Sequence, residues 1–160
     1  MSGFLEALVA RAGHYRGEGK NHDDQTFIGR LELSPIIRGL GVQIAFSATG
    51  LDGEVYHEEV TLVAPGQSGE PSLVTLCSNA PGLLTLPIRT LGTGEDDETT
   101  AVFGLGARED LDAFRMEIAF DLWPGGDMTY RFGWGLPGDS FEPRSSVRMR
   151  TDHKDLAVPS

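Results

Sequence analysis

Apolar and polar residues alternate along most of the chain, and this period of two is typical of strands with one buried face. The clearest run is Phe114, Met116, Ile118, Phe120 and Leu122, and an earlier one is Val42, Ile44, Phe46 and Ala48. Turn signals rich in glycine, proline and aspartate separate such runs. The pattern predicts roughly ten strands, near residues 14–20, 26–33, 40–49, 54–64, 72–78, 83–91, 98–105, 111–122, 127–135 and 145–152.

The start of the chain has a different period. Between Gly3 and Ala12 the apolar residues Phe4, Leu5, Leu8 and Val9 recur at spacings of three and four, which indicates a helix. Gly13 supplies a natural stop. We therefore expect one short N-terminal helix that caps an end of the sheet structure.

The predicted strands fit one domain that spans residues 1–160, because a chain of this length buries enough surface around a single core. So many strands in one domain must close into a barrel or stack as two sheets. A closed barrel leaves no exposed edge strands. We expect an all-β fold, a roughly ten-stranded antiparallel up-and-down barrel with a short N-terminal helix, and a two-sheet sandwich is the alternative.

Charge and cysteine content narrow the function classes. The formal net charge of −11 argues against binding to nucleic acid or to an anionic membrane surface, since both require clustered Lys and Arg. Cys77 is the only cysteine, so no internal disulfide can form, and its apolar neighbours predict a buried, inert thiol. The first residues resemble neither a signal peptide nor a membrane span, and we expect a cytoplasmic protein.

Five Gly-x-Gly pairs, at residues 17/19, 39/41, 92/94, 104/106 and 133/135, raise the question of a phosphate loop. A dinucleotide loop needs a third glycine and a following helix, and no helical pattern follows any pair. Close backbone approach within a barrel is the better interpretation. His22-Asp23-Asp24 similarly predicts a polar turn between strands rather than a metal site.

Residues 54–60, EVYHEEV, carry the most informative polar pair. Alternation places His57 and Glu59 on one face together with Val55. Pointing inward, the pair could orient a ligand, act as acid and base, or approach an iron. Pointing outward, it would be a polar surface, and both interpretations stay open at this stage.

Two further strands bear on a ligand site. Arg148 and Arg150 share a face opposite Val147 and Met149, so we expect the arginines to point outward. Tyr130, Phe132 and Trp134 also share a face, which predicts core packing or a cavity wall. No Gly-x-Ser-x-Gly elbow is present, so nothing supports covalent catalysis.

The stretch Gly13-His14-Tyr15-Arg16-Gly17-Glu18-Gly19 resembles the G-x-W-x-G-x-G start of nitrobindin-like, fatty-acid-binding-like β-barrels of the calycin group, with Tyr15 in place of the tryptophan. Tyr56-His57-Glu58-Glu59 and Ser78–Leu84 extend the resemblance. It implies a ten-stranded barrel with a short N-terminal helix. It also implies the haem of nitrobindins, with His57 on the distal side and His153, the only late histidine, as the iron ligand.

The leading hypothesis is a barrel that binds a small apolar or amphipathic ligand without a cofactor. Its candidate lining residues are Tyr15, His57, Glu59, Phe114, Phe120 and Trp134. The alternatives are a haem protein that acts on nitric oxide or peroxynitrite through His153, and a lyase or isomerase that uses His57 and Glu59. Assembly of the barrel into a homodimer is left open.

Overall fold

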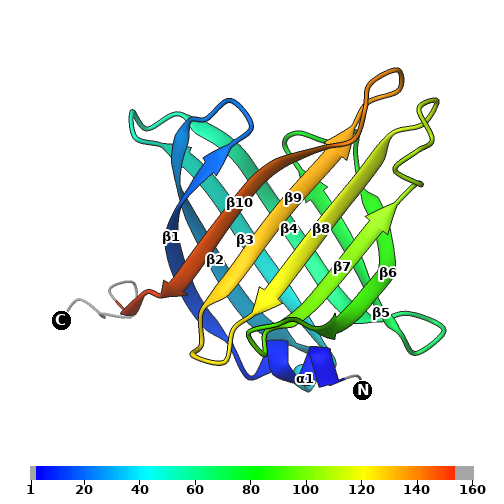
Figure 1. Ribbon diagram of the computed structural model, residues 1–160. Coiled ribbons are helices and arrows are strands. Elements are labelled where there is room, and N and C mark those ends of the chain that lie inside the picture. Colours follow the sequence, from blue (N-terminus) through cyan, green and yellow to red (C-terminus); the bar gives the residue numbers. More distant parts are fainter. Residues whose placement is uncertain (1–2, 154–160) are drawn as a thin grey trace.

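The computed structural model describes residues 3–153 and shows ten antiparallel strands closed into a barrel (Figure 1). Each strand pairs with its neighbours in sequence, and β1 pairs with β10. The predicted up-and-down barrel and its N-terminal helix are confirmed. The elements are α1 (Gly3–Val9), β1 (Gly13–Asn21), β2 (Thr26–Ile36), a 3-10 turn (Ile37–Gly39), β3 (Gly41–Gly50), β4 (Val55–Pro65), β5 (Pro71–Cys77), β6 (Leu84–Thr93), β7 (Thr99–Leu105), β8 (Arg115–Leu122), β9 (Met128–Gly135) and β10 (Glu142–Thr151).

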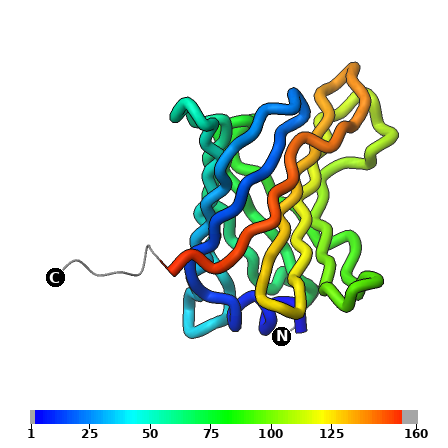
Figure 2. Tube along the Cα trace, turned by 60° about the vertical axis from the view of Figure 1, so that its left-hand side comes forward, coloured from blue at the N-terminus to red at the C-terminus, as the bar shows by residue number. Residues whose placement is uncertain are grey.

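Glycines in β1 allow the barrel to close. Figure 2 shows β1 in blue beside β10 in red, so the first and last strands of the chain are neighbours in the barrel. A Cβ at Gly17 would overlap the carbonyl oxygen of Arg148, and a Cβ at Gly19 would lie 2.7 Å from the Phe27 ring. The first Gly-x-Gly pair therefore serves close backbone approach, as expected, because any side chain there would push β10 away.

The two ends of the barrel differ. Helix α1 covers one end and buries Phe4, Leu5 and Leu8 (Figure 1). The Phe4 ring lies 6.0 Å from the rings of Phe103 and Phe120. Within residues 3–153 no helix covers the other end, where the mouth of the barrel is surrounded by the loops at residues 22–25, 51–54, 78–83, 106–114 and 136–141. Access to the interior through this open end would not require α1 to move.

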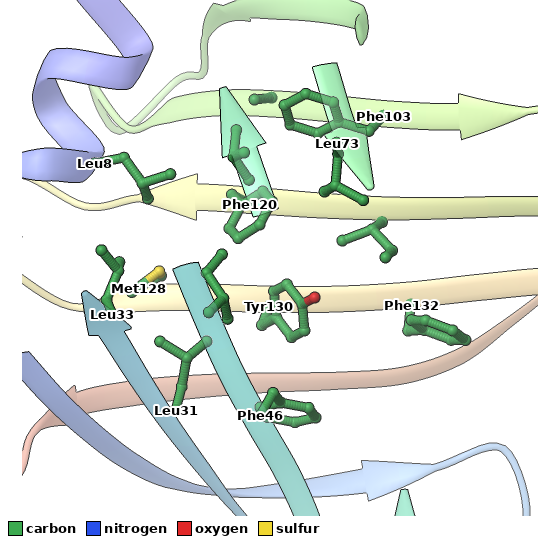
Figure 3. Close-up of a cluster of buried hydrophobic side chains, with 14 of the residues drawn as sticks. Leu8, Leu31, Leu33, Phe46, Leu73, Phe103, Phe120, Met128, Tyr130 and Phe132 are labelled. Atoms are coloured by element: carbon green, nitrogen blue, oxygen red, sulfur yellow. The ribbon is translucent and has the colours of Figure 1, made fainter. Parts of the chain in front are cut away.

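The middle of the barrel is filled by side chains (Figure 3). Bulky residues occupy inward positions on nearly every strand, and among those with no exposed surface are Ile44, Val63, Leu73, Leu86, Phe103, Ile118 and Phe120. Their rings and branched chains interlock as in any protein core. The interior at mid-height is therefore a core and not a wide cavity.

Strand β8 begins later than predicted. The alternation suggested residues 111–122, whereas β8 runs from Arg115 to Leu122 and residues 106–114 form a loop. Arg115 is fully buried and donates hydrogen bonds to the carbonyls of Arg108 and Ala113 in this loop (both 2.9 Å). It also donates to Leu136 (2.7 Å) and Asp139 (2.5 Å) in the loop after β9. One guanidinium thus holds two loops of the open end together.

The polar turns and arginines predicted from the sequence lie where expected. His22, Asp23 and Asp24 are exposed in the turn between β1 and β2, and the side chains of Arg148 and Arg150 are exposed on the outside of β10. Within residues 3–153, no helix is long and apolar enough to cross a membrane.

Candidate functional site

Strand β4 directs a row of polar side chains into the barrel. His57, Glu59 and Thr61 are buried, while their neighbours Glu58 and Val60 are exposed. This is the alternation of a strand with one buried face. The open question from the sequence is thereby answered: the His57 and Glu59 pair points inward.

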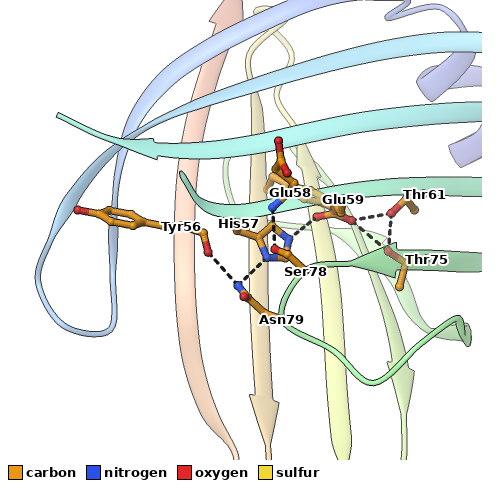
Figure 4. Close-up of polar contacts among 9 residues, drawn as sticks. Tyr56, His57, Glu58, Glu59, Thr61, Thr75, Ser78 and Asn79 are labelled. Atoms are coloured by element: carbon orange, nitrogen blue, oxygen red, sulfur yellow. Dashed lines mark hydrogen bonds and ion pairs between the residues drawn. The ribbon is translucent and has the colours of Figure 1, made fainter. Parts of the chain in front are cut away.

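Glu59 is the centre of a buried polar network (Figure 4). Its side chain has no exposed surface, and its Oε2 accepts hydrogen bonds from the hydroxyls of Thr61 (2.6 Å) and Tyr130 (2.8 Å). Oε1 lies 3.2 Å from His57 Nε2, and the hydroxyl of Thr75 lies 2.8 Å from that of Thr61. Donors surround both oxygens, an arrangement that suits a carboxylate anion, because hydrogen bonds to the charged form offset part of its desolvation.

The hydrogen bonds of Asn79 fix the proton position on His57. The Asn79 side-chain nitrogen lies 3.1 Å from the carbonyl oxygen of Tyr56 and 2.9 Å from His57 Nδ1. Since the carbonyl needs a donor, this atom is the amide NH2 group, and Nδ1 must accept its second proton. The imidazole proton is then on Nε2, which donates to Glu59. His57 is held in one tautomer from both sides.

Aromatic rings enclose the imidazole. The ring of Phe132 lies 4.9 Å from that of His57, and the ring of Phe46 lies 6.0 Å away. Tyr130 packs edge-on against Phe46 at 4.9 Å. Aromatic rings from β3 and β9 therefore flank the network.

A small pocket lies above this network at the open end, with a volume of about 100 Å³. Drug-sized ligands usually occupy pockets of about 300 Å³ or more, so this pocket suits a small molecule or one end of a larger one. It is smaller than the enclosed cavity that we expected, because bulky side chains fill the middle of the barrel. Its lining residues include His57, Asn79, Phe46, Phe132, Trp134 and Arg144.

The predicted site residues divide into two groups. His57 and Trp134 line the pocket, and Glu59 lies directly beneath His57. Tyr15 and Phe120 do not reach it. Tyr15 lies near the α1 end and donates a hydrogen bond to the carbonyl of Arg11 (2.6 Å), Phe120 is part of the filled core, and Phe114 packs on the core from the loop before β8.

Several residues of the buried network and of the pocket were not singled out from the sequence. Thr61 continues the inward face of His57 and Glu59, so the alternation of β4 already contained a signal for it. Thr75 pairs with Thr61 across β4 and β5, which only the register reveals. Asn79 is in a loop and Arg144 is in a β-bulge, and alternation gives no information about side-chain direction at either place.

The described residues do not fit the haem that the resemblance implies. His153 is exposed just beyond β10, next to the start of β1, where Asp152 N donates to His14 O (2.7 Å). This is the α1 end of the barrel, opposite the mouth beside His57. A pocket of about 100 Å³ is also far too small for a porphyrin. Among residues 3–153, no group of three or more His, Cys, Asp or Glu side chains could hold a metal ion.

Two larger hollows lie on the outside of the barrel. One of about 700 Å³ crosses the outer faces of β1 to β5 and includes Arg30, Ala45 and Val60. The other, of about 290 Å³, crosses β8 to β10. We favour the inner pocket in spite of its size, because the fully buried Glu59 network lies beneath it and aromatic rings form its walls.

Burial disfavours ionisation of two groups near the network. It raises the pKa of the Cys77 thiol, which fits the predicted inert cysteine. Burial, followed by the charge of Glu59, raises the pKa of Tyr130 well above its ordinary value of 10.0. The Tyr130 hydroxyl therefore stays a donor to Glu59 at any physiological pH.

The substitution Tyr130→Phe tests this part of the network. Near neutral pH it should lower the free energy of unfolding by about 1–3 kcal/mol, because the buried carboxylate loses a donor. The raised pKa adds a pH effect: the hydroxyl's contribution is complete below the unfolded pKa of about 10 and is lost as pH rises toward the folded pKa. Urea unfolding at a series of pH values would show both effects.

Tyr56→Phe is the control for the loss of a phenol, because Tyr56 is only partly buried and its hydroxyl takes no part in the network, to which only its backbone carbonyl contributes. It should leave the stability near neutral pH almost unchanged. Equal destabilisation by the two substitutions would contradict the role of Tyr130.

Comparisons with known proteins support the fold. No family model matches the chain, and no curated protein matches its sequence. Among solved structures, the chain is similar to the crystal structure of Rv2717c from M. tuberculosis, with 12% sequence identity over 95% of this chain and 99% of that chain and a TM-score of 0.69. At this identity the likeness shows a shared fold, a closed ten-stranded barrel consistent with the calycin-like group.

Proposed function

We propose that this protein binds a small apolar or amphipathic molecule at the open end of the barrel, with His57 as the polar group that meets it. The observation that carries the proposal is the pocket beside His57, whose imidazole is fixed by Glu59 below and by a loop residue, Asn79, at the mouth. Binding sites commonly combine apolar walls with a few fixed polar groups.

The free energy that it costs to bury the Glu59 network supports the proposal. Among residues 3–153, no Lys or Arg pairs with the buried Glu59 carboxylate. Such a carboxylate is expensive to bury, and well-packed apolar residues in its place would often be as stable or more so. Strand β4 is held in its register by backbone pairing with β3 and β5. The barrel therefore does not need the side-chain network in order to close. A local arrangement that costs stability is expected at a functional site, where it orients a group for a task.

The walls define the character of the ligand. Phe46, Ala48, Phe132 and Trp134 provide an apolar surface, while His57 Nδ1 and the Asn79 amide provide hydrogen-bonding groups on one side. A bound molecule that accepts from Asn79 or donates to Nδ1 would replace the contact between these two residues. A ligand larger than the pocket would extend outward between the loops of the open end.

Native mass spectrometry of the purified protein tests the proposal with two matched variants. Ala48→Leu fills the inner pocket, whereas Ala45→Leu, on the same strand but facing outward, fills the outer hollow. We expect a co-purified small molecule that is lost from Ala48→Leu and kept by Ala45→Leu. A molecule kept by Ala48→Leu and lost from Ala45→Leu would overturn the proposal.

A second candidate is acid and base chemistry, favoured by the orientation of the His57 and Glu59 pair. Because the Nε2–H group donates a hydrogen bond to Glu59, the basic atom of His57 is Nδ1, and this atom faces the mouth of the barrel. A bound substrate would have to displace Asn79 to deliver its proton there. Under this alternative, His57→Gln would abolish turnover of a bound compound while binding persists.

A further inference from the structure

Arg144 has an unusual place in the sheet. In the pairing of β10 with β9, Pro143 lies opposite Gly133 and Ser145 lies opposite Phe132, so Arg144 is the extra residue of a β-bulge. Bulges redirect side chains and are common beside binding sites. Here the guanidinium carbon of Arg144 lies 3.9 Å from the centre of the Trp134 ring, at the mouth of the pocket.

The guanidinium is fixed but keeps free donors. Its Nε donates to the carbonyl of Trp134 (3.2 Å), and stacking on the ring holds its plane. Its two Nη groups make no hydrogen bond or ion pair within residues 3–153. By contrast, Arg131 is paired with Asp121 (2.9 Å) on the outside of the barrel.

An unpaired, oriented cation at a pocket mouth is notable in a chain with a net charge of −11. Arg144 lines both the inner pocket and the adjoining hollow of about 290 Å³, together with Asn21, His22 and Ser145. A group bound to its Nη atoms would lie at the rim, within reach of a molecule inserted toward His57.

We infer that Arg144 binds the carboxylate of the ligand, so that the ligand is a small carboxylic acid whose uncharged part enters the pocket between Phe132 and Trp134. The planar fork of two N–H donors matches a carboxylate. A phosphate is less suited, since among residues 3–153 no second Lys or Arg lines the inner pocket. This inference rests on the proposed function and specifies its ligand class.

Benzoate and its neutral analogue benzamide are suitable probes, because they share a ring and differ in charge. Binding would be followed by calorimetry and by the ¹H–¹⁵N signals of Trp134 and Asn79. We expect benzoate to bind more tightly than benzamide by roughly ten- to a hundredfold, the range for charged hydrogen bonds. Arg144→Gln should remove this preference, so that benzoate and benzamide bind about equally.

Arg148→Gln is the matched control. Arg148 lies on the same strand and also stacks on a tryptophan, with its guanidinium 4.1 Å from the Trp123 ring, but it is paired with Asp127 and lies outside the pocket. It should leave the binding of both probes unchanged.

The outcomes separate the two proposals. Equal binding of benzoate and benzamide, or a benzoate preference that survives Arg144→Gln, would overturn the role of Arg144 while pocket binding stands. If neither probe shifts the signals of Trp134 or Asn79, both the ligand class and the proposed pocket are contradicted.

Discussion

Replacement of Glu59 by glutamine should destabilise the protein by about 3 kcal/mol, a typical cost of disrupting a buried charged network. The hydroxyls of Thr61 and Tyr130 need an acceptor, so the amide oxygen of the glutamine must face them. Its NH2 group then faces His57 Nε2, which already carries a proton. If the proton moved to Nδ1, it would instead face the NH2 group of Asn79, which is also a donor. A pair of donors therefore faces each other in either tautomer, in the buried interior at Nε2 or against the exposed Asn79 side chain at Nδ1.

Urea unfolding of Glu59→Gln and of the exposed neighbour variant Glu58→Gln would measure this effect. Glu58→Gln should stay within about 0.5 kcal/mol of the parent protein, as surface substitutions usually do. Addition of Asn79→Asp to Glu59→Gln should recover part of the loss, because an aspartate accepts from a protonated Nδ1. No recovery, together with equal effects of the two glutamine variants, would contradict the assigned tautomer.

Replacement of Arg115 by methionine should cost at least about 3 kcal/mol, because four carbonyl acceptors would lose a charged donor and each such hydrogen bond contributes roughly 1.5–3 kcal/mol. The side chain is fully buried and donates to four backbone carbonyls in two loops. Methionine fills a similar volume but leaves these acceptors without donors. The loops at residues 106–114 and 136–141 would lose the link that joins them.

Urea unfolding and hydrogen exchange would test this prediction, with Arg150→Met as the control. The Arg150 side chain is 85% exposed and lies 3.7 Å from Asp127, so its removal should cost less than about 1 kcal/mol. Arg115→Met should also speed up hydrogen exchange in both loops. A stability equal to that of Arg150→Met, with protected loops, would show that the loops are held by other contacts.

The sequence was sufficient to predict the strands, because the alternation of apolar residues and the turn signals both come from local chemistry. It also indicated the correct face of Arg148 and Arg150, since Val147 and Met149 are buried on the opposite face of β10. The face of His57 stayed open because Val55, His57 and Glu59 are no more apolar as a set than their neighbours. Only the closed barrel shows that His57 and Glu59 are inside, while Val55 is exposed.

The height of a residue along the barrel could not be read from alternation. Tyr15, Phe120 and Trp134 all point inward, yet they lie near the α1 end, in the core and at the mouth, respectively. Only the register of ten paired strands relates these levels. Residues placed by loops and bulges, such as Asn79 and Arg144, follow no period at all, and they complete the site.

The filled core restricts where function can be located. A barrel of this strand number could enclose a large cavity, but bulky inward residues occupy its middle and α1 covers one end. What remains is a mouth with a fixed imidazole, aromatic walls and an oriented guanidinium. The chain thus combines a stable core with a small polar site at one end.

Binding at the open end is tested most directly by the indole signals of the two tryptophans. Trp134 lines the pocket, whereas Trp123 lies in the turn after β8 at the α1 end and donates to Thr129 (2.9 Å). In a ¹H–¹⁵N screen of small carboxylates and neutral fragments, we predict compounds that shift the Trp134 indole signal, leave Trp123 unchanged and have no effect on Ala48→Leu. Failure of every compound to shift Trp134 selectively, or shifts that persist in Ala48→Leu, would contradict a ligand site at the mouth of the barrel.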